Sequence, residues 1–514
     1  MISEGIKSVL LSPACLACIL GGTFIGIVFG SVPGLSAVMA VCLFLPLTYG
    51  LTAVNGMSLL CALYIGAISG GLISAILLKI PGTPSSIVTV FDGGPMADRG
   101  EGGKAIGTAI LVSFIGGIIS VVALIFLSPL LAKFALKFTA YEYATCIFFA
   151  MTVIAVLTGK QPIMGLISAF FGIFLSTVGS APLTSVVRFA PTTSSMAGGF
   201  SSTTIMIGFF AISEILEYGF NYNKEQKKPI IKTAKIRGYG ISFKELIRNT
   251  RLLIQSTIIG IIIGILPGIG GNTGAMMSYS AAQVTSKHPE RFGKGSIEGL
   301  IASETANNAT TGGAMVPMLT LGIPGSGTAA LLMSGLIIHG VQPGPMIFRT
   351  QGVLMYGIFT ALALANIVMV IMERSLLPIF VKLLSVPKNI LLPIITVMCV
   401  LGCFSANHII FDVICMFVFG VIGFLMRKWK IPISPAVIGF VLAPSFERYL
   451  RTGVINTRGN LSRLYTSPIC LVFLILSLVF IAIPIIRGVK DSKARKAAVA
   501  AGAAPEEDEE LQED

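Results

Sequence analysis

The first half of the chain contains the stretch Lys79-Ile80-Pro81-Gly82-Thr83-Pro84-Ser85-Ser86, and the second half contains the related stretch Gly322-Ile323-Pro324-Gly325-Ser326-Gly327-Thr328. In each stretch a Pro-Gly pair interrupts an apolar helix and leaves backbone N–H and C=O groups without helical partners. Lipid cannot satisfy those groups, so such a break is tolerated in a membrane only where it is buried in protein or lines a wet cavity. Paired breaks at matching positions of two halves are typical of a transport site.

The composition is that of an integral membrane protein. Hydrophobic residues make up 54% of the 514 residues, charged residues only 11%, and the mean hydropathy is +0.89. Soluble domains contain about 25% charged residues. Apolar runs of roughly 20 residues, the length that a helix needs to cross a bilayer, recur along the chain. We therefore expect an all-α polytopic membrane protein with about 12 transmembrane helices.

The net charge of +13 comes from basic residues in the loops between apolar runs. This pattern indicates topology under the positive-inside rule rather than a nucleic-acid partner. Residues 221–251 carry nine Lys or Arg residues and are predicted to be a cytoplasmic linker. A lipid head-group or regulatory patch is the alternative for this segment. A basic edge after the last apolar run, near 467–486, places the C-terminus in the cytoplasm.

The two halves of the chain share motifs in the same order. Pro33-Gly34 recurs 234 residues later as Pro267-Gly268, Pro81-Gly82 recurs 243 residues later, and Gly94-Pro95-Met96 recurs 250 residues later. We infer an internal duplication, and by analogy with similar transporter folds we expect the two repeats to be inverted. The predicted units are a first membrane repeat (1–220), the linker (221–251), a second membrane repeat (252–455), a C-terminal span (456–488) and a disordered cytoplasmic tail (489–514).

No arrangement of residues suggests an enzyme. The three histidines, His288, His339 and His408, are far apart in the sequence, and the nine cysteines all lie in apolar stretches. Cys15 and Cys18 have the spacing of a metal pair, but no second pair follows at zinc spacing. No phosphate-binding Gly-x-x-x-x-Gly-Lys-[Ser/Thr] loop is present. An ion channel and an intramembrane enzyme remain weaker alternatives to a transporter.

Several motifs resemble those of the large membrane subunit of the tripartite tricarboxylate transporters (TctA type). The matching blocks are Tyr64-Ile65-Gly66-Ala67, Ile80-Pro81-Gly82-Thr83, Asp92-Gly93-Gly94-Pro95-Met96-Ala97, residues 287–299, Glu304-Thr305-Ala306-Asn307-Asn308-Ala309, Thr320-Leu321-Gly322-Ile323-Pro324-Gly325 and residues 339–345. The likeness covers about residues 20–455, and the blocks from 287 onward are the most specific.

This resemblance implies a permease of the bacterial inner (plasma) membrane that imports citrate-like tricarboxylates or related carboxylates. It also implies two partners: a periplasmic solute-binding protein and a small membrane subunit of about four helices. Import would be a symport driven by a Na⁺ or H⁺ gradient, with no other cofactor. Another small organic anion is the alternative substrate. Lys79 departs from the small polar residue usual before the first Ile-Pro-Gly, and it either pairs with a substrate carboxylate or snorkels from a helix end.

The two breaks supply the candidate substrate site. The N-terminus of a half-helix offers unpaired N–H donors and a positive dipole end to a carboxylate, and its freed carbonyls suit Na⁺. The alternative is that each Pro-Gly pair only kinks a packed helix. The candidate substrate-binding residues are Lys79, Gly82, Thr83, Pro84, Ser85, Ser86, Asn307, Asn308, Gly325, Ser326, Gly327 and Thr328.

Polar residues near the breaks are candidates for coupling transport to a cation. Glu304 and Asn308 lie four residues apart on one helix face, where they could ligate Na⁺, carry a proton or form interhelical hydrogen bonds. Asp412 is an acid inside an apolar run, either a coupling group or a structural hydrogen-bond acceptor at a helix end. Asn272 and Thr273 follow a second Pro-Gly pair and are weaker candidates for the same role.

Overall fold

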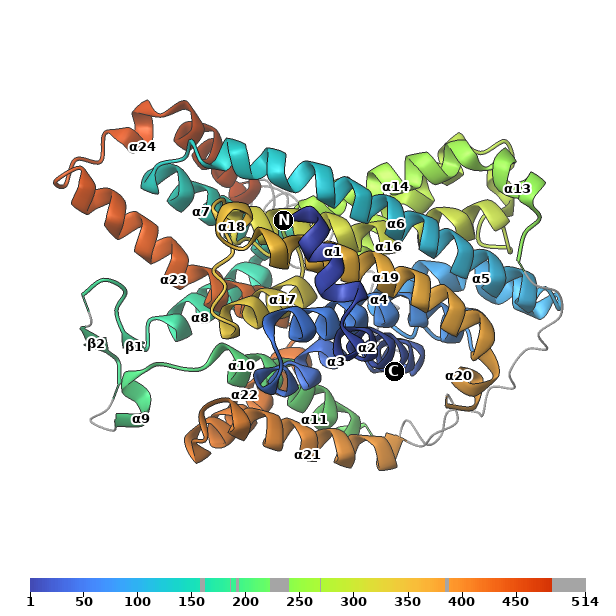
Figure 1. Cartoon of the computed structure of the whole chain (residues 1–514), viewed down its shortest axis with the longest axis horizontal. Coiled ribbons are helices and arrows are strands. Elements are labelled where there is room, and N and C mark those ends of the chain that lie inside the picture. Colours follow the sequence, from blue (N-terminus) through green and yellow to red (C-terminus); the bar gives the residue numbers. More distant parts are fainter. Residues whose placement is uncertain are drawn as a thin grey trace, which may run out of the picture.

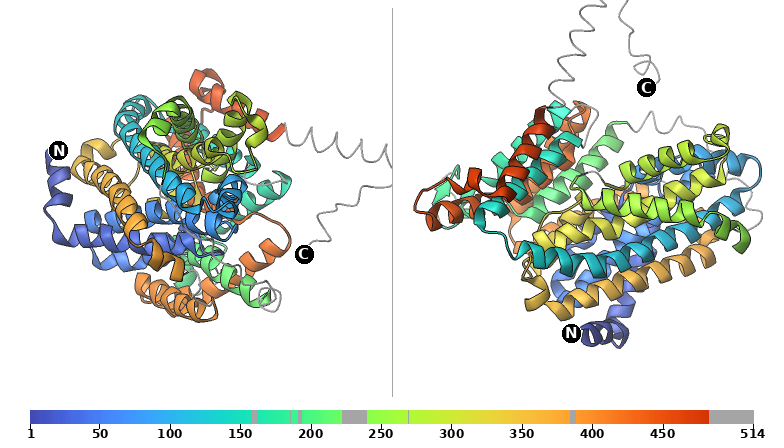
Figure 2. Two further views of the ribbon diagram at one scale, coloured as in Figure 1. Left: turned by 90° about the vertical axis from the view of Figure 1, so that its right-hand side faces the viewer. Right: turned by 90° about the horizontal axis from the view of Figure 1, so that it is seen from above.

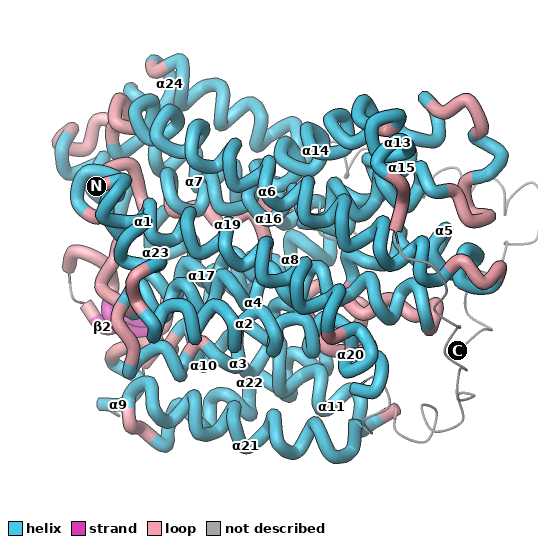
Figure 3. The backbone as a smooth tube through the Cα atoms, turned by 45° about the vertical axis from the view of Figure 1, so that its right-hand side comes forward, coloured by secondary structure: helices cyan, strands magenta, loops and turns pink. Residues whose placement is uncertain are grey.

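The computed structural model describes residues 1–157, 162–184, 186–190, 194–221, 240–268, 270–383 and 388–482. Helices make up nearly all of this part of the chain (Figure 3). The first half contains α1 (Ile2–Leu10), α2 (Pro13–Ser31), α3 (Ala37–Phe44), η1 (Pro46–Gly50), α4 (Ala53–Leu77), η2 (Pro84–Ser86), α5 (Ile87–Asp98), α6 (Gly102–Ala135), α7 (Ala140–Leu157), α8 (Pro162–Ser176), β1 (Gly179–Ser180), β2 (Val187–Arg188), α9 (Ser194–Ala197), α10 (Ser202–Met206), the π-helix η3 (Ile207–Ile212) and α11 (Ser213–Phe220). The second half contains α13 (Phe243–Arg248), α14 (Thr250–Ile265), α15 (Gly270–Thr285), η4 (Pro289–Arg291), α16 (Ile297–Leu321), α17 (Gly327–Ile338), α18 (Ile347–Thr350), α19 (Gly352–Ser375), α20 (Leu377–Leu383), α21 (Lys388–Asn407), α22 (Ile410–Lys428), α23 (Ile433–Asn456) and α24 (Arg463–Thr466).

In the part of the chain that the structure describes, six helical segments are long and apolar enough to cross a membrane: α2, α4, α6, α10–η3–α11, α19 and α22. The chain is therefore an all-α polytopic membrane protein, with β1 and β2 forming a small antiparallel ribbon in which Gly179 pairs with Arg188. Six further apolar helices are shorter, so the count of about 12 full spans stays a prediction. The apolar stretch after the Pro33-Gly34 pair forms the eight-residue α3 followed by the 3₁₀-helix η1, and together they are too short to cross a membrane.

Two helical hairpins lie against two long central helices. α2 turns at the Pro33-Gly34 pair into α3, and both helices pack on α4. α14 turns at the Pro267-Gly268 pair into α15, and both pack on α16. Both turns use a Gly with positive φ, 89° at Gly34 and 79° at Gly268, a conformation that only Gly adopts freely. The Pro33-Gly34 and Pro267-Gly268 pairs, which are 234 residues apart, therefore form equivalent turns.

Glycines bring each hairpin into backbone contact with its long helix. A Cβ atom on Gly26 would lie 2.5 Å from the carbonyl oxygen of Leu63, and one on Gly260 would lie 2.5 Å from that of Ala306. Leu63 and Ala306 are 243 residues apart, while Gly26 and Gly260 are 234 apart, the same two offsets that relate the motifs. Any side chain at these glycines would collide with backbone, so the close approach needs small residues, as is usual between membrane helices.

The long helices α4 and α16 run in opposite directions. The first residues of α16 lie beside α5, which follows the end of α4, because the Ser296 N–H donates to Asp92 Oδ1 at 2.6 Å. At the other end, α17 follows α16 and packs near the start of α4, where a Cβ atom on Gly335 would lie 3.3 Å from Met57 Sδ. Figure 3 shows α5 and α15 on the right and α3 and α17 further to the left.

Two further groups of helices flank these elements. α7 and α8 pack against α23, on the left of Figure 1, and α22 packs against η3 and α11. Figure 2 shows α23 and α24, in red, at one side of the main bundle. An Arg–Glu pair holds each group: Arg188 Nη1 lies 2.7 Å from Glu447 Oε1, and Arg427 Nη1 lies 2.7 Å from Glu214 Oε2. Arg427 Nη1 also lies 3.0 Å from Glu217 Oε2, so the two acids of the apolar segment Ser202–Phe220 share one partner.

Two predicted segments fall partly or wholly outside the described residues. Of the linker 221–251, residues 222–239 lie outside, and the remainder includes α13, which begins with a capping box at Ser242 and Glu245. Backbone N–H donation from Ser242 holds the pKa of Glu245 below its usual value, and Lys104 acts in the same direction from 3.1 Å. The predicted tail 489–514 and the end of the C-terminal span, 483–488, also lie outside.

Candidate functional site

The first break forms a tight turn lined with hydroxyl groups. The Thr83 N–H donates to Ser86 Oγ at 3.2 Å, and the Ser86 hydroxyl donates back to the Thr83 carbonyl oxygen at 2.8 Å. This reciprocal cap satisfies backbone groups that the Pro-Gly interruption leaves free. Thr83 Oγ1 lies 3.1 Å from Ser85 Oγ, so these hydroxyls are adjacent. A Cβ atom on Gly82 would collide with the carbonyl oxygen of Gly30, which fixes the turn against α2.

Of the polar side chains of the first break, Ser85 lies beside α15 and α16, whereas the hydroxyls of Thr83 and Ser86 face Gly71 on α4. A Cβ atom on Gly271 would lie 2.8 Å from Asn307 Oδ1, 3.1 Å from Thr310 Oγ1 and 3.3 Å from Ser85 Cβ. Gly271 therefore lets η2, α15 and α16 meet at close range, with no room for even a methyl group between Gly271 and Asn307. The structure thus brings the predicted residues Ser85 and Asn307 together, although one comes from each half of the chain.

Asn307, on α16, has an unpaired side-chain amide at the place where η2, α15 and α16 meet. It is fully buried, and within the described part of the chain neither Oδ1 nor Nδ2 has a hydrogen-bond partner within 3.5 Å, although the amide lies near the Glu304 carboxyl. An unpaired buried amide costs free energy, so native proteins rarely keep one without a ligand, ion or water that uses it. Both a donor and an acceptor are available here, which suits a carboxylate on one side and a cation on the other.

Glu304 lies one helical turn before Asn308 on α16 and is fully buried. Its carboxyl accepts hydrogen bonds from the hydroxyls of Thr89 on α5 and Ser113 on α6, the latter at 3.0 Å, and from Asn308 Nδ2 at 3.4 Å. Asn308 Oδ1 has no partner among the described residues. This arrangement contains interhelical hydrogen bonds, as one reading of the sequence expected, and it leaves an amide oxygen free for a cation. Thr89 and Ser113 were not anticipated from the sequence.

Two further predicted residues, Asn272 and Thr273, are on α15 near the first break. Asn272 and Thr273 follow Gly271 in the first turn of α15, where Asn272 is exposed and Thr273 is partly buried. They follow the Pro267-Gly268 turn in sequence and lie near the first break in space, since α15 packs on η2.

The second break differs from the first because most of its neighbours are apolar. Ser326 caps α17 by accepting from the Ala329 N–H at 3.2 Å, and the Gly268 N–H donates to the Gly325 carbonyl oxygen at 2.9 Å. A Cβ atom on Gly327 would meet apolar atoms, Phe210 Cζ at 3.5 Å and Val38 Cγ2 at 3.7 Å. Thr328 is buried in the same region. The backbone of this break is therefore largely satisfied inside the protein.

Contacts along α16 connect the two breaks. Thr310 lies beside Gly271 at the first break, and a Cβ atom on Gly325 at the second break would lie 3.0 Å from Ala314. Thr310 and Ala314 are one helical turn apart on the same face of α16. The two breaks thus share one supporting helix.

Two predicted residues lie elsewhere. Lys79 follows the end of α4, and its ammonium forms an ion pair with Asp98 at 2.7 Å, where both side chains are about half exposed (47% and 58%). This contact favours the helix-end interpretation of Lys79. Asp412 lies in the first turn of α22 and accepts from Asn407 Nδ2 at 2.7 Å, as expected of a structural acceptor at a helix end.

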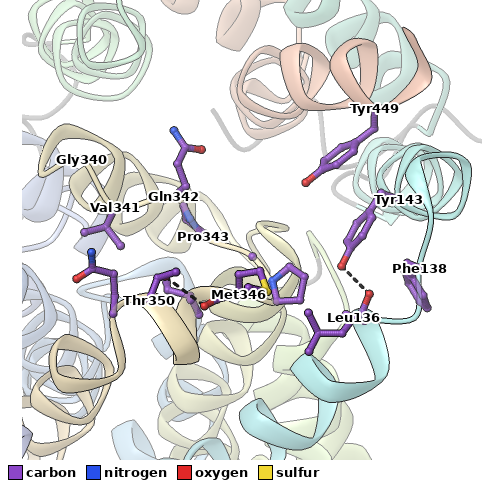
Figure 4. A pocket seen from close by; sticks show the side chains of 15 residues that line it. Leu136, Phe138, Tyr143, Gly340, Val341, Gln342, Pro343, Met346, Thr350 and Tyr449 are labelled. Carbon is purple, nitrogen blue, oxygen red and sulfur yellow. Dashed lines mark hydrogen bonds between the residues drawn. The ribbon is translucent and has the colours of Figure 1, made fainter. Parts of the chain in front are cut away.

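A separate surface groove of about 590 Å³ lies between the loop after α17 and the ends of α6, α7 and α23 (Figure 4). Tyr143 and Tyr449 stack with ring centroids 4.9 Å apart, and the Tyr143 hydroxyl donates to the Ala135 carbonyl oxygen. Gln342 and Thr350 supply polar groups opposite them, but no charged side chain lines the groove. It therefore lacks the positive charge that a multiply charged anion would need.

Antiparallel broken helices, each supported by a turned hairpin, define the molecule as a polytopic membrane protein with a buried polar site at a helix break. The sequence matches the family model described as "Tripartite tricarboxylate transporter TctA family" over residues 16–438, and the chain belongs to this transporter family. The match confirms the resemblance stated from the motifs, and it indicates a tricarboxylate transporter permease rather than an enzyme.

Two relatives come from Agrobacterium vitis. One is described as "Uncharacterized 52.8 kDa protein in TAR-I ttuC' 3'region"; it is 34% identical over 483 residues, which cover 94% of this chain and 95% of the relative. The other is described as "Uncharacterized protein in TAR-II ttuC' 3'region"; it is 35% identical over 234 residues, which cover 46% of this chain and 97% of the relative. No solved structure matches the chain.

Proposed function

We propose that this chain is the large permease subunit of a secondary transporter that imports citrate-like tricarboxylates or related carboxylates. A periplasmic binding protein would deliver the substrate, and a small membrane subunit would complete the complex, as a tripartite family implies. The complex would reside in the bacterial inner membrane with the C-terminus in the cytoplasm, which the basic residues after the last apolar run support. A Na⁺ or H⁺ gradient would drive import as a symport.

We further propose that the two halves are inverted repeats. The opposite directions of α4 and α16 support this arrangement, and so do the hairpins that pack on them through matching glycines. Inverted repeats place a shared site near the middle of the membrane and allow one half to move against the other. This geometry would expose the site alternately to the two sides.

The observation that carries the proposal is the buried, unpartnered amide of Asn307 beside the hydroxyls of the first break. In our proposal Asn307 Nδ2 and the Ser85 hydroxyl donate to a substrate carboxylate, and the Thr83 hydroxyl, 3.1 Å from Ser85 Oγ, supports Ser85. Asn307 Oδ1 and Asn308 Oδ1 face the coupling ion, and Glu304 supplies its counter-charge. Amide and carboxylate oxygens are ligands that hard cations prefer. The second break serves mainly to hold α17 and the hairpin of α14.

The test is uptake of labelled citrate into vesicles that contain this chain, its small subunit and a binding protein, with and without an imposed Na⁺ gradient. We expect accumulation that saturates with citrate and requires a Na⁺ or H⁺ gradient. Saturation and gradient dependence separate a transporter from a channel. Uptake of another organic anion, but of no di- or tricarboxylate, would contradict the proposed substrate class while leaving the permease assignment in place.

A further inference from the structure

A second buried acid lies in the membrane domain outside the site described above. Glu373 is in the last turn of α19 and is fully buried. Ser69 on α4 donates its hydroxyl to Glu373 Oε2 at 3.0 Å, while Oε1 has no hydrogen-bond partner among the described residues. An acid at the end of an apolar run and directly before Arg374 would be expected at a membrane surface, but this one points inward.

The surroundings of Glu373 differ from those of Glu304 and Glu142, two other buried acids. The carboxyl of Glu304 receives three side-chain donors, and that of Glu142 receives the Thr139 N–H, the Ser467 hydroxyl at 2.7 Å and Arg463 Nε at 3.7 Å. The carboxyl of Glu373 receives one donor, the Ser69 hydroxyl. A buried carboxylate without compensating donors or a cation is costly, whereas a neutral carboxylic acid is not. The site is therefore built for the protonated form.

The charged groups around Glu373 do not supply a counter-ion. Of the elements that pack on α19, α2 and α4 present no charged side chain near Glu373; α1 carries Glu4 and Lys7, and α18 carries Arg349, at the opposite end of α19. On α6, Lys104 is paired with Glu245 at 3.1 Å. Arg374 and Lys382 have interactions of their own. Glu304 is itself an acid and cannot compensate a negative charge on Glu373.

Further unpaired polar atoms lie where α6 meets α16 and α19. A Cβ atom on Gly117 would collide with Asn366 Oδ1, and one on Gly116 would collide with the carbonyl oxygen of Thr305. Asn366 Oδ1 and Thr305 Oγ1 are both buried without a partner in the described structure. Asn366 is two turns before Glu373 on the same face of α19, and Thr305 adjoins Glu304. We refer to Glu373, Asn366, Thr305 and Glu304 as the polar seam; Glu373 and Asn366 are about 10 Å apart along α19, a distance that water would have to bridge.

We propose that Glu373 is a proton-binding site of the transporter, which takes up one proton to become a carboxylic acid and releases it again during the cycle. The polar seam would carry that proton, through water bonded to the unpaired oxygens, toward or away from Glu304. The ligand of this site is H⁺, and the reaction needs no other reactant. The inference rests on the proposed transport function and makes protons part of its coupling.

The transport test compares wild type with Glu373→Gln in proteoliposomes that also contain the small subunit and a binding protein. Citrate uptake is followed over a series of pH values, together with proton movement reported by an internal pH dye. Gln keeps the size of the neutral acid and cannot release a proton. We expect Glu373→Gln to reduce uptake driven by a pH gradient by about tenfold or more and to flatten the pH profile, while citrate exchange continues.

Glu142→Gln is the matched control, because Glu142 is also a buried acid but lies outside the seam. Its pH profile and proton movement should match those of wild type. An unchanged pH profile and unchanged proton movement in Glu373→Gln would overturn the proposal.

A second measurement does not depend on transport. Infrared spectroscopy of the purified wild-type complex at neutral pH should show the C=O stretch of a protonated carboxyl group, and Glu373→Gln should lose that band. Absence of the band from wild type, or its persistence in Glu373→Gln, would overturn the proton site. If wild type shows the band but carries no citrate, the proposed substrate is wrong and the proton site stands.

Discussion

The two helix breaks are built on the same plan but have opposite chemistry. On α16, beside the first break, lie Glu304, Asn307 and Asn308. The residues 243 positions earlier, on α4, are Cys61, Tyr64 and Ile65, and all six side chains are buried. On the hairpins, Gly271 and Asn272 correspond, at 234 positions, to Ala37 and Val38. One break thus faces amides and a carboxylate, and the other faces mainly apolar side chains.

This difference shows which contacts a duplicated fold must keep and which it can change. The packing that both halves retain joins glycine to backbone carbonyl, as between Gly70 and Ile27 and between Gly313 and Ile261, where an added Cβ would lie 2.5 and 2.6 Å from the oxygen. Such contacts do not depend on neighbouring side chains. The side chains around each break could therefore diverge, one set toward ligand chemistry and the other toward packing.

The largest effect is expected from a substitution of Asn307, beside the first break. Asn307→Leu should reduce citrate uptake by about 10- to 150-fold, the loss expected when hydrogen bonds to a charged group disappear. Because the Asn307 amide has no protein partner, Leu should leave the thermal unfolding temperature unchanged or raise it. Uptake in vesicles and unfolding in detergent measure the two effects.

Tyr64→Phe is the matched change at the equivalent position and should alter uptake by less than about tenfold. If Asn307→Leu transports normally, or if Tyr64→Phe is equally damaging, the polar break is not the binding site.

The second prediction concerns Glu304, the buried acid near the first break. Glu304→Gln replaces an acceptor oxygen with an NH₂ group that faces the donor hydroxyls of Thr89 and Ser113, so it removes both the charge and a hydrogen bond. We expect uptake to fall by about tenfold or more and its dependence on the cation gradient to weaken. Cys61→Ala, at the matching position, should preserve both properties. Gradient-dependent uptake in Glu304→Gln at the wild-type level would exclude Glu304 from coupling.

The third prediction sharpens the comparison by testing what the breaks share. Ala at Gly82 would collide with the Gly30 carbonyl oxygen, and Ala at Gly325 would lie 2.6 Å from that of Gly264. Both variants should lower the free energy of unfolding by about 1–3 kcal/mol, with Gly82→Ala the more damaging. Gly21→Ala, which meets no atom within 4 Å, is the control. Equal stability of all three proteins in thermal unfolding would contradict the close packing.

The smallest effect is expected from the cap of the second break. Ser326→Ala removes the acceptor for the Ala329 N–H and should lower stability by about 0.5–2 kcal/mol. Citrate affinity should not change, because the second break is assigned to packing. A weaker citrate affinity in Ser326→Ala would show that substrate reaches this break too.

Features with a local signature could be predicted from the sequence. Pro-Gly pairs and repeated glycines determine backbone geometry where they stand, so the broken helices and the hairpin turns were predictable. The function of a polar residue depends on which residues the fold places opposite it. The pairing of Lys79 with Asp98, and the donation of Thr89 and Ser113 to Glu304, join distant positions. Glu373 resembled an ordinary charged helix end, since nothing local shows that it points into the bundle.

The hydrogen bonds of Asp92 have a mechanical consequence. Asp92 Oδ1 accepts from the Gly295 and Ser296 N–H groups at 2.8 and 2.6 Å, and Oδ2 accepts from the Tyr279 hydroxyl at 2.9 Å. These bonds fasten α5 to the end of α15 and to the start of α16. These bonds link the three helices beside the first break, α5, α15 and α16, into one unit. Motion that opens the break would therefore move these three helices as a unit against α4 and α6, on which α5 and α16 pack.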